Sequence, residues 1–136
     1  MKLHAKFKTP INIDVHTETE RGDIITTREP LLTCWKGRYI YVPAWFQCDG
    51  VSVPRFLWIS VSPRIHHPTL RAGICHDYIY RTQPSGWTRA DADKMFYDFC
   101  REDGFGWYRA QKAYIGLRAF GRVAWNDSAK KLKGVK

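Results

Sequence analysis

Several signals that would place a chain in a well-known class are missing from these 136 residues. No apolar run approaches the roughly 20 residues that a membrane-spanning helix needs. Residues 1–10 contain no apolar segment of the kind that a signal peptide carries. No internal repeat occurs, and the only biased stretch is the lysine-rich end. We therefore expect a protein that is synthesised in the cytoplasm and has no transmembrane segment.

Also missing is any cysteine pattern typical of a metal site or a disulfide framework. A zinc site is one alternative, built from Cys48, Cys75 and His66 or His67. No pair of these residues has the spacing of zinc ligands, however. We expect all the cysteines to be free thiols. They are Cys34, Cys48, Cys75 and Cys100.

Acidic residues are scarce, since 13 Asp and Glu stand against 22 Lys and Arg and the net charge is +9. Most of this excess follows Gly104, where Asp127 is the only acidic residue. Such a segment favours an anionic partner, either phospholipid headgroups or nucleic acid. The alternative is a solubilising helix surface with a frayed tail. The basic residues are Arg109, Lys112, Arg118, Arg122, Lys130, Lys131, Lys133 and Lys136.

The first 47 residues are predicted to form a small antiparallel sheet. Ile13 and Val15 alternate with polar residues, which is the period of a half-buried strand, and residues 24–27 are β-branched throughout. Lys36-Gly37 separates two further strand-like runs, Leu31–Trp35 and Arg38–Val42, and this arrangement indicates a hairpin.

Three helices are predicted after the sheet, so the expected fold class is α+β. The first begins at Pro68 and runs to about Arg81. The second begins at Thr88, which forms a capping-box pattern with Asp91, and runs to about Glu102. The third covers 107–125, with one face made of Ala110, Ala113, Tyr114, Leu117, Phe120 and Ala124. The chain is expected to be one domain, with a β-rich part (1–47), a helical core (48–125) and a basic flexible tail (126–136).

One group of ionisable residues indicates chemistry. His76 and Asp77 are adjacent on the first helix, and Tyr80 lies one turn beyond His76 on the same side. If the second helix packs antiparallel, Asp93 can face His76 and orient its imidazole as a general base. Asp77 then points elsewhere, where it can bind a cation. The alternative is that His76 is a hydrogen-bonded histidine of the core.

A second carboxylate for such a cation precedes the helices. Asp49-Gly50 is a turn at which backbone carbonyls can point inward, although an Asp-Gly turn also has a purely structural use. Oxygen ligands from Asp49, Gly50 and Asp77 would suit Ca²⁺ better than zinc.

Four segments of the chain, between residues 46 and 125, together resemble secreted bacterial phospholipase A2. Each is weak alone, but their order makes the resemblance fairly specific. The whole chain also resembles a phage and bacterial family that is catalogued only as a domain of unknown function, number 1353. The segments are Asp49-Gly50-Val51-Ser52, His76-Asp77-Tyr78-Ile79-Tyr80, Ala92-Asp93-Lys94-Met95-Phe96, and Arg118-Ala119-Phe120-Gly121-Arg122-Val123-Ala124.

The phospholipase resemblance implies a role for each matching residue. His76 would be the general base for the water that attacks the sn-2 ester. Asp93 would orient His76, and Tyr80 would hydrogen-bond Asp93. Asp77 and Asp49 would bind Ca²⁺ by carboxylate, with the Gly50 carbonyl as a further ligand, and the cation would polarise the ester carbonyl.

The chain departs from the secreted enzymes in two respects. Their disulfide between the calcium loop and the catalytic helix would fall on Val51 and Gly73, so no disulfide can form there. The β-rich start is not part of those enzymes, and it is available for docking or assembly.

Three function classes are compatible with these features. The preferred hypothesis is a calcium-dependent phospholipase A2-like hydrolase, encoded by a phage and acting on anionic phospholipid membranes of the host. The second is a non-enzymatic virion or assembly protein that contacts other phage structural proteins; in either case the protein would be virion-associated or released at lysis. The third is a nucleic-acid-binding protein or nuclease, but no HNH-type pattern supports it. Ser52 lacks a GxSxG motif, which argues against a serine hydrolase.

Overall fold

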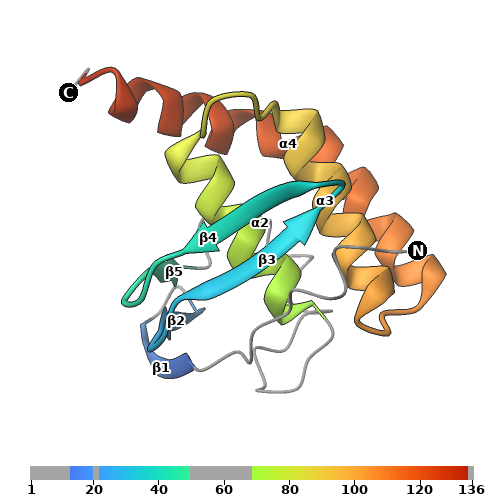
Figure 1. Ribbon diagram of the computed structural model, residues 1–136, viewed down its shortest axis with the longest axis horizontal. Coiled ribbons are helices and arrows are strands. Elements are labelled where there is room, and N and C mark those ends of the chain that lie inside the picture. Colours follow the sequence, from blue (N-terminus) through green and yellow to red (C-terminus); the bar gives the residue numbers. More distant parts are fainter. Residues whose placement is uncertain (1–12, 20–21, 50–68, 135–136) are drawn as a thin grey trace. The chain divides into compact units, whose positions relative to one another are not determined.

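The computed structural model describes residues 13–19, 22–49 and 69–134 (Figure 1). The chain divides into two compact units, Met1–Asp49 and Gly50–Lys136. The described strands belong to the first unit and the described helices to the second. The predicted α+β class, with strands first and three helices after them, is therefore confirmed. The division falls two residues beyond the predicted end of the β-rich part.

The first unit contains a three-stranded antiparallel sheet with the order β1-β2-β5. Its strands are β1 (Ile13–Thr19), β2 (Gly22–Thr27) and β5 (Gln47–Asp49). Strand β5 pairs with β2 although some 20 residues separate them along the chain, with Ile25 opposite Cys48. Strand β5 was not predicted from the sequence, because three residues are too few to show a period of two.

A separate two-stranded sheet is formed by β3 (Leu31–Trp35) and β4 (Arg38–Val42), as predicted (Figure 1). The two residues of the turn, Lys36 and Gly37, have positive φ angles of 49° and 79°. This is the backbone conformation that a two-residue hairpin requires, and glycine adopts it without a steric penalty.

Thr27 connects the end of β2 to the segment that leads into β5. Its hydroxyl donates to the Pro43 carbonyl at 2.9 Å and accepts from the Phe46 amide at 3.0 Å. Its own backbone groups bond to Trp45 and Phe46. Because Thr27 is 1% exposed, these bonds satisfy polar groups that water cannot reach.

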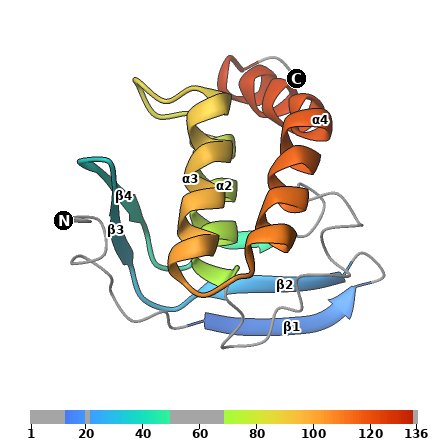
Figure 2. The same cartoon turned by 90° about the vertical axis from the view of Figure 1, so that its right-hand side faces the viewer.

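The second unit contains α2 (Leu70–Thr82), α3 (Arg89–Glu102) and α4 (Trp107–Leu132). Figure 2 shows α2 and α3 side by side, with α4 packed along them. The predicted capping box is present, because the Thr88 side chain accepts from the Asp91 amide and the Asp91 side chain accepts from the Thr88 amide. This reciprocal pair explains why α3 begins at Arg89.

Two details of the third helix were predicted wrongly. The helix continues to Leu132, seven residues beyond its predicted end, and includes most of the segment expected to be a tail. Phe120 is 63% exposed, whereas Ala110, Ala113 and Leu117 of the predicted face are buried. Phe120 projects about 60° away from Leu117 around the helix, and Gly121 takes the buried position instead.

All four cysteines are buried free thiols, as predicted. Burial raises the pKa of Cys75 to about 12, an effect that the nearby Arg71 charge only partly offsets. Cys75 is therefore protonated and unreactive at neutral pH. Among the described helices, none is both long enough and apolar enough to cross a membrane.

Candidate hydrolytic site

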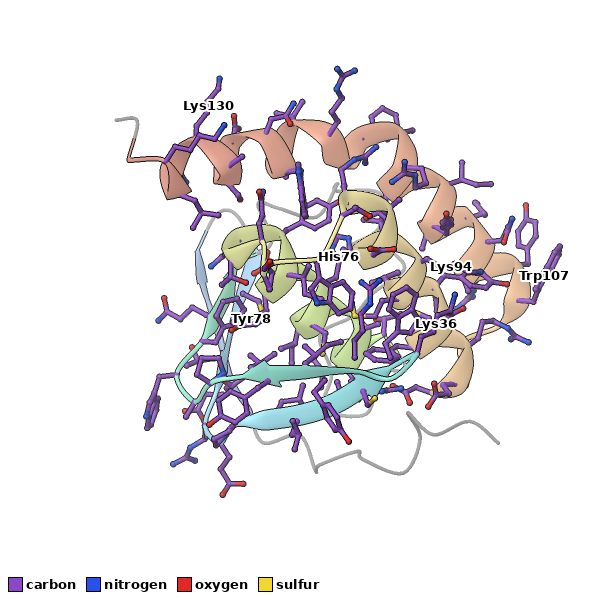
Figure 3. The ribbon with its side chains drawn as sticks, turned by 45° about the horizontal axis from the view of Figure 1, so that its top comes forward. Lys36, His76, Tyr78, Lys94, Trp107 and Lys130 are labelled. Atoms are coloured by element: carbon purple, nitrogen blue, oxygen red, sulfur yellow. The ribbon has the colours of Figure 1, made fainter. Side chains whose placement is uncertain are left out.

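Three of the predicted site residues form one hydrogen-bonded cluster between α2 and α3. Nε2 of His76 lies 2.8 Å from Oδ1 of Asp93, and the Tyr80 hydroxyl donates to the same oxygen at 2.6 Å. All three residues are at most 3% exposed. Figure 3 shows His76 on α2, inside the layer of side chains that these helices share. The predicted geometry is thus confirmed, while the catalytic role of the cluster is a separate question.

The helical phase of α2 explains why two of its residues reach one carboxylate. His76 and Tyr80 are four residues apart and therefore lie on one side of the helix. Their rings lie 4.2 Å apart, and the Phe96 ring contacts His76 edge-on at 5.5 Å. Tyr80 also packs against Trp125 of α4 at 5.1 Å. These contacts restrict the imidazole to a single orientation.

The hydrogen bonds determine where the proton of His76 lies. Burial alone would raise the pKa of Asp93, but the bonds from His76 and Tyr80, with that from Arg118, lower it below its ordinary value. Burial and the Asp93 charge raise the pKa of Tyr80, so its hydroxyl keeps its proton. Because an ionised Asp93 can only accept, Nε2 of His76 must be a donor. Neutral His76 then has its lone pair on Nδ1.

The second oxygen of Asp93 is bound by two arginines. Nη1 of Arg118, from α4, lies 2.9 Å from Oδ2, and Nη1 of Arg89 lies 3.4 Å away. Arg89 also donates to the Leu117 and Arg118 carbonyls of α4, at 3.0 and 3.3 Å. Asp93 therefore receives donors from all three helices that are described in this unit.

Gly121 of α4 makes room for this arrangement. A Cβ atom at this position would lie 2.5 Å from the Tyr80 hydroxyl oxygen and 3.2 Å from Nη1 of Arg89. Real Cβ atoms do not approach an oxygen so closely. Any side chain at Gly121 would therefore displace Tyr80 or Arg89 from its place beside Asp93.

The predicted calcium ligands are only partly described. Asp77 is 2% exposed, and its Oδ2 lies 3.2 Å from Nε of Arg81 one turn later. Gly50 lies outside the described residues, as does the side chain of Asp49. Within the described part, no group of three His, Cys, Asp or Glu residues is placed to bind a metal. The calcium site therefore stays a prediction.

Asp77 could provide part of a Ca²⁺ site, because Ca²⁺ takes about six to eight oxygen ligands and one carboxylate supplies at most two. Asp77 supplies suitable oxygen atoms, but Arg81 would have to move away first. The Arg81 side chain is 34% exposed, so neighbouring residues do not enclose it completely. The fit then depends on ligands from residues outside the described part.

The roles of Arg89, Arg118 and Gly121 were not predicted from the sequence. Arg89 precedes Asp93 by four residues, which is a readable signal for an ion pair on one helix. Arg118 and Gly121 were noticed only as part of a pattern, since no local rule connects α4 to a carboxylate of α3. The predicted order of the helices does not show which residues of α4 contact the Asp93 carboxylate.

The outer surface of α4 combines exposed apolar and basic residues. Most of the large hydrophobic side chains that are exposed in the described part belong to this helix. Figure 3 shows Trp107 and Lys130 projecting away from opposite ends of α4. The exposed residues of this surface are Trp107, Tyr108, Arg109, Lys112, Ile115, Phe120, Arg122 and Val123.

These features define an α+β protein whose helical unit carries a buried His–Asp pair. The model of one protein family matches residues 26–117, more than half of the chain, and the chain belongs to this family: protein of unknown function, DUF1353. The match runs from the end of β2 into α4 and includes His76, Asp77, Arg89 and Asp93. No curated protein and no solved structure matches the chain.

Proposed function

We propose that this protein is a hydrolase of the phospholipase A2 type, in which His76 activates a water molecule for attack on a phospholipid ester. One observation carries the proposal: Nε2 of His76 donates to an ionised Asp93, so that Nδ1 has the lone pair. Within the described residues, no hydrogen bond is made to Nδ1. A buried imidazole with one nitrogen oriented by a carboxylate and the other available is the arrangement of a general base.

The reaction follows from that arrangement. Nδ1 of His76 would take a proton from water as the water oxygen attacks the ester carbonyl carbon. Asp93 would stabilise the resulting imidazolium, since its negative charge lies 2.8 Å from Nε2. Collapse of the tetrahedral intermediate breaks the bond to the lipid alcohol, and His76 returns the proton to that oxygen. The products are a fatty acid and a lysophospholipid.

The outer surface of α4 supports an anionic lipid aggregate as the site of action. Basic side chains attract anionic headgroups, and exposed aromatic side chains are stable at the boundary between headgroups and acyl chains. The action of a phage-encoded enzyme on host membranes, as a virion component or after lysis, is an extension of this proposal.

Calcium is the proposed cofactor, held by Asp77 with Asp49 and Gly50. A bound Ca²⁺ would supply Lewis-acid stabilisation of the oxyanion. Asp77 is the described residue that fits this role, because its carboxylate is buried and is adjacent to the general base in sequence.

Hydrolysis can be tested on vesicles of phosphatidylglycerol, with fatty acid release measured in millimolar-scale Ca²⁺ and in EGTA. His76→Gln keeps an N–H donor for Asp93 but has no base, so we expect a loss of about 10²- to 10⁴-fold. Asp98→Asn is the matched control, because Asp98 pairs with Lys94 on α3 and projects about 140° away from Asp93 around this helix. No release by the wild type, or equal release by His76→Gln, would contradict the proposal.

The calcium site can be tested without activity. A ligand that binds only the folded state raises the melting temperature. We expect millimolar-scale Ca²⁺ to raise it for the wild type and for Asp98→Asn, but not for Asp77→Asn. If the wild type shows no shift, the calcium-dependent form of the proposal fails.

A second candidate is a non-enzymatic assembly protein on the same scaffold. It is favoured by the two arginines on Asp93, which connect three helices and give the cluster a structural use. This candidate predicts that His76→Gln changes stability but that the wild type releases no fatty acid.

A further inference from the structure

Both carboxylate oxygens of Asp93 accept hydrogen bonds, and the donors to the two oxygens come from different helices. Oδ1 accepts from α2, through His76 and Tyr80, whereas Oδ2 accepts from the arginines of α3 and α4. A carboxylate turns about one soft torsion, so two donors on each oxygen define its plane. The direction in which Oδ1 faces His76 therefore depends on what holds Oδ2.

The two arginines hold Oδ2 unequally. Arg118 lies 2.9 Å away, which is a strong charge-assisted bond, while Arg89 at 3.4 Å is near the limit of a hydrogen bond. Arg89 has further bonds to two carbonyls of α4, so its removal would disturb the packing of two helices. The Arg118 side chain is 38% exposed, and within the described residues its only hydrogen bond goes to Asp93.

We propose that Arg118 is a positioning residue of the His76–Asp93 pair: from α4 it holds Oδ2 of Asp93, and thereby keeps Oδ1 aimed at Nε2 of His76. The inference rests on the proposed hydrolytic function. Without Arg118, the 3.4 Å contact to Arg89 is the one bond that Oδ2 keeps among the described residues, and water does not reach this site, since Asp93 is 0% exposed. The carboxylate would then turn toward Arg89 or become protonated, and either change weakens its bond to His76.

The hydrogen-bond donors around Asp93 come from each of the three described helices. His76 and Tyr80 belong to α2, Arg89 to α3 and Arg118 to α4. Arg118 is the member that can be changed with the least effect on the others, because its guanidinium extends from a partly exposed position. It is also the residue by which α4, distant in sequence from His76, contributes to the geometry of the base.

The test compares Arg118→Gln, Arg118→Lys and the control Arg101→Gln. Like Arg118→Gln, Arg101→Gln removes one positive charge. It also removes one hydrogen bond, the one from Arg101 to the Phe105 carbonyl. Arg101 lies about two helical turns beyond Asp93 on α3. At saturating phosphatidylglycerol vesicles, we expect turnover to fall about tenfold or more in Arg118→Gln, the scale of a misplaced catalytic group. Arg118→Lys should recover part of the loss, and Arg101→Gln should keep wild-type turnover. If the wild type is active, equal turnover of both glutamine variants would overturn the inference.

A second measurement separates failure of this inference from failure of the proposed function. The ¹⁵N resonances of the His76 imidazole report which ring nitrogen carries the proton, whether or not any lipid is hydrolysed. We expect the Nε2–H tautomer in the wild type and in Arg101→Gln, and a mixture of tautomers in Arg118→Gln. A wild-type spectrum that persists in folded Arg118→Gln and Arg118→Lys would overturn the positioning role, while an inactive wild type with the expected spectra would overturn only the hydrolase.

Discussion

Two buried ionic clusters connect α2 to α3, and they have opposite charges at their centres. In the first cluster, the Asp93 carboxylate is surrounded by hydrogen-bond donors. In the second cluster, the guanidinium of Arg71 forms a bidentate pair with the Asp103 carboxylate, at 2.9 and 3.1 Å, and lies 3.5 Å from Glu102. Arg71 is 2% exposed and also stacks on the Phe99 ring.

The difference between the clusters lies in their capacity to move a proton. A guanidinium stays protonated at any physiological pH, so the Arg71 cluster can only hold the helices together. The Asp93 cluster includes an imidazole, in which one ring nitrogen can donate a proton while the other accepts one. Similar burial and similar distances therefore produce a purely structural ion pair in one place and a candidate catalytic pair in the other.

The largest expected effect on stability comes from the structural cluster. Arg71→Met removes a buried cation between two partly buried carboxylates, and such a change costs about 3 kcal/mol of unfolding free energy. Urea unfolding measures it. Turnover per folded molecule should stay at the wild-type value, because the Asp93 bonds do not involve Arg71. A large loss of turnover in the folded variant would show that the two clusters are coupled.

A smaller effect is expected at Gly121. Gly121→Ala places a methyl group against the Tyr80 hydroxyl, and overpacking of this kind costs about 1–3 kcal/mol. Both the unfolding free energy and the vesicle turnover should fall. The matched control is Gly73→Ala on α2, where no described atom lies within 4 Å of the new Cβ. That variant should be stabilised by up to about 1 kcal/mol, since alanine favours a helix; a stable and fully active Gly121→Ala would contradict the packing argument.

The third prediction concerns acid. The pKa of Asp93 is lower in the folded state than its unfolded value of about 3.9. Its contribution to stability is therefore complete above about pH 4 and is lost as the pH falls through the folded value. Unfolding free energies measured from pH 5 downward should decline faster for the wild type than for Asp93→Asn, by up to about 1.4 kcal/mol per pH unit. Parallel declines would show that Asp93 is not the responsible carboxylate.

The smallest effect is expected at an exposed pair on the same helix. Lys94 lies 3.6 Å from Asp98 one turn later, and both side chains are partly exposed to solvent. Asp98→Asn should change the unfolding free energy by less than about 0.5 kcal/mol, because solvent screens such pairs. A cost comparable to that of Arg71→Met would mean that burial is not what separates these clusters from surface pairs.

Much of the fold could be predicted because its signals are local. The β3–β4 hairpin follows from Lys36-Gly37, and the start of α3 follows from Thr88 and Asp91. The His76–Tyr80–Asp93 cluster was predicted from helical phase and one assumption, that adjacent helices pack antiparallel. These inferences need only residues that are close in sequence or on consecutive elements.

What the sequence by itself determined is therefore most of the described strands and helices, without β5, and the residues of the pair on α2 and α3. Only the tertiary structure decided that β5 joins β2, that Phe120 faces outward, and that Arg118 and Gly121 of α4 complete the surroundings of Asp93. The physical reason is that a helix face is defined by sequence only to within a broad arc, whereas a 2.9 Å bond depends on how far the third helix is rotated and shifted against the other two. Many weak packing contacts, spread over the whole unit, set that rotation, and no single motif encodes it.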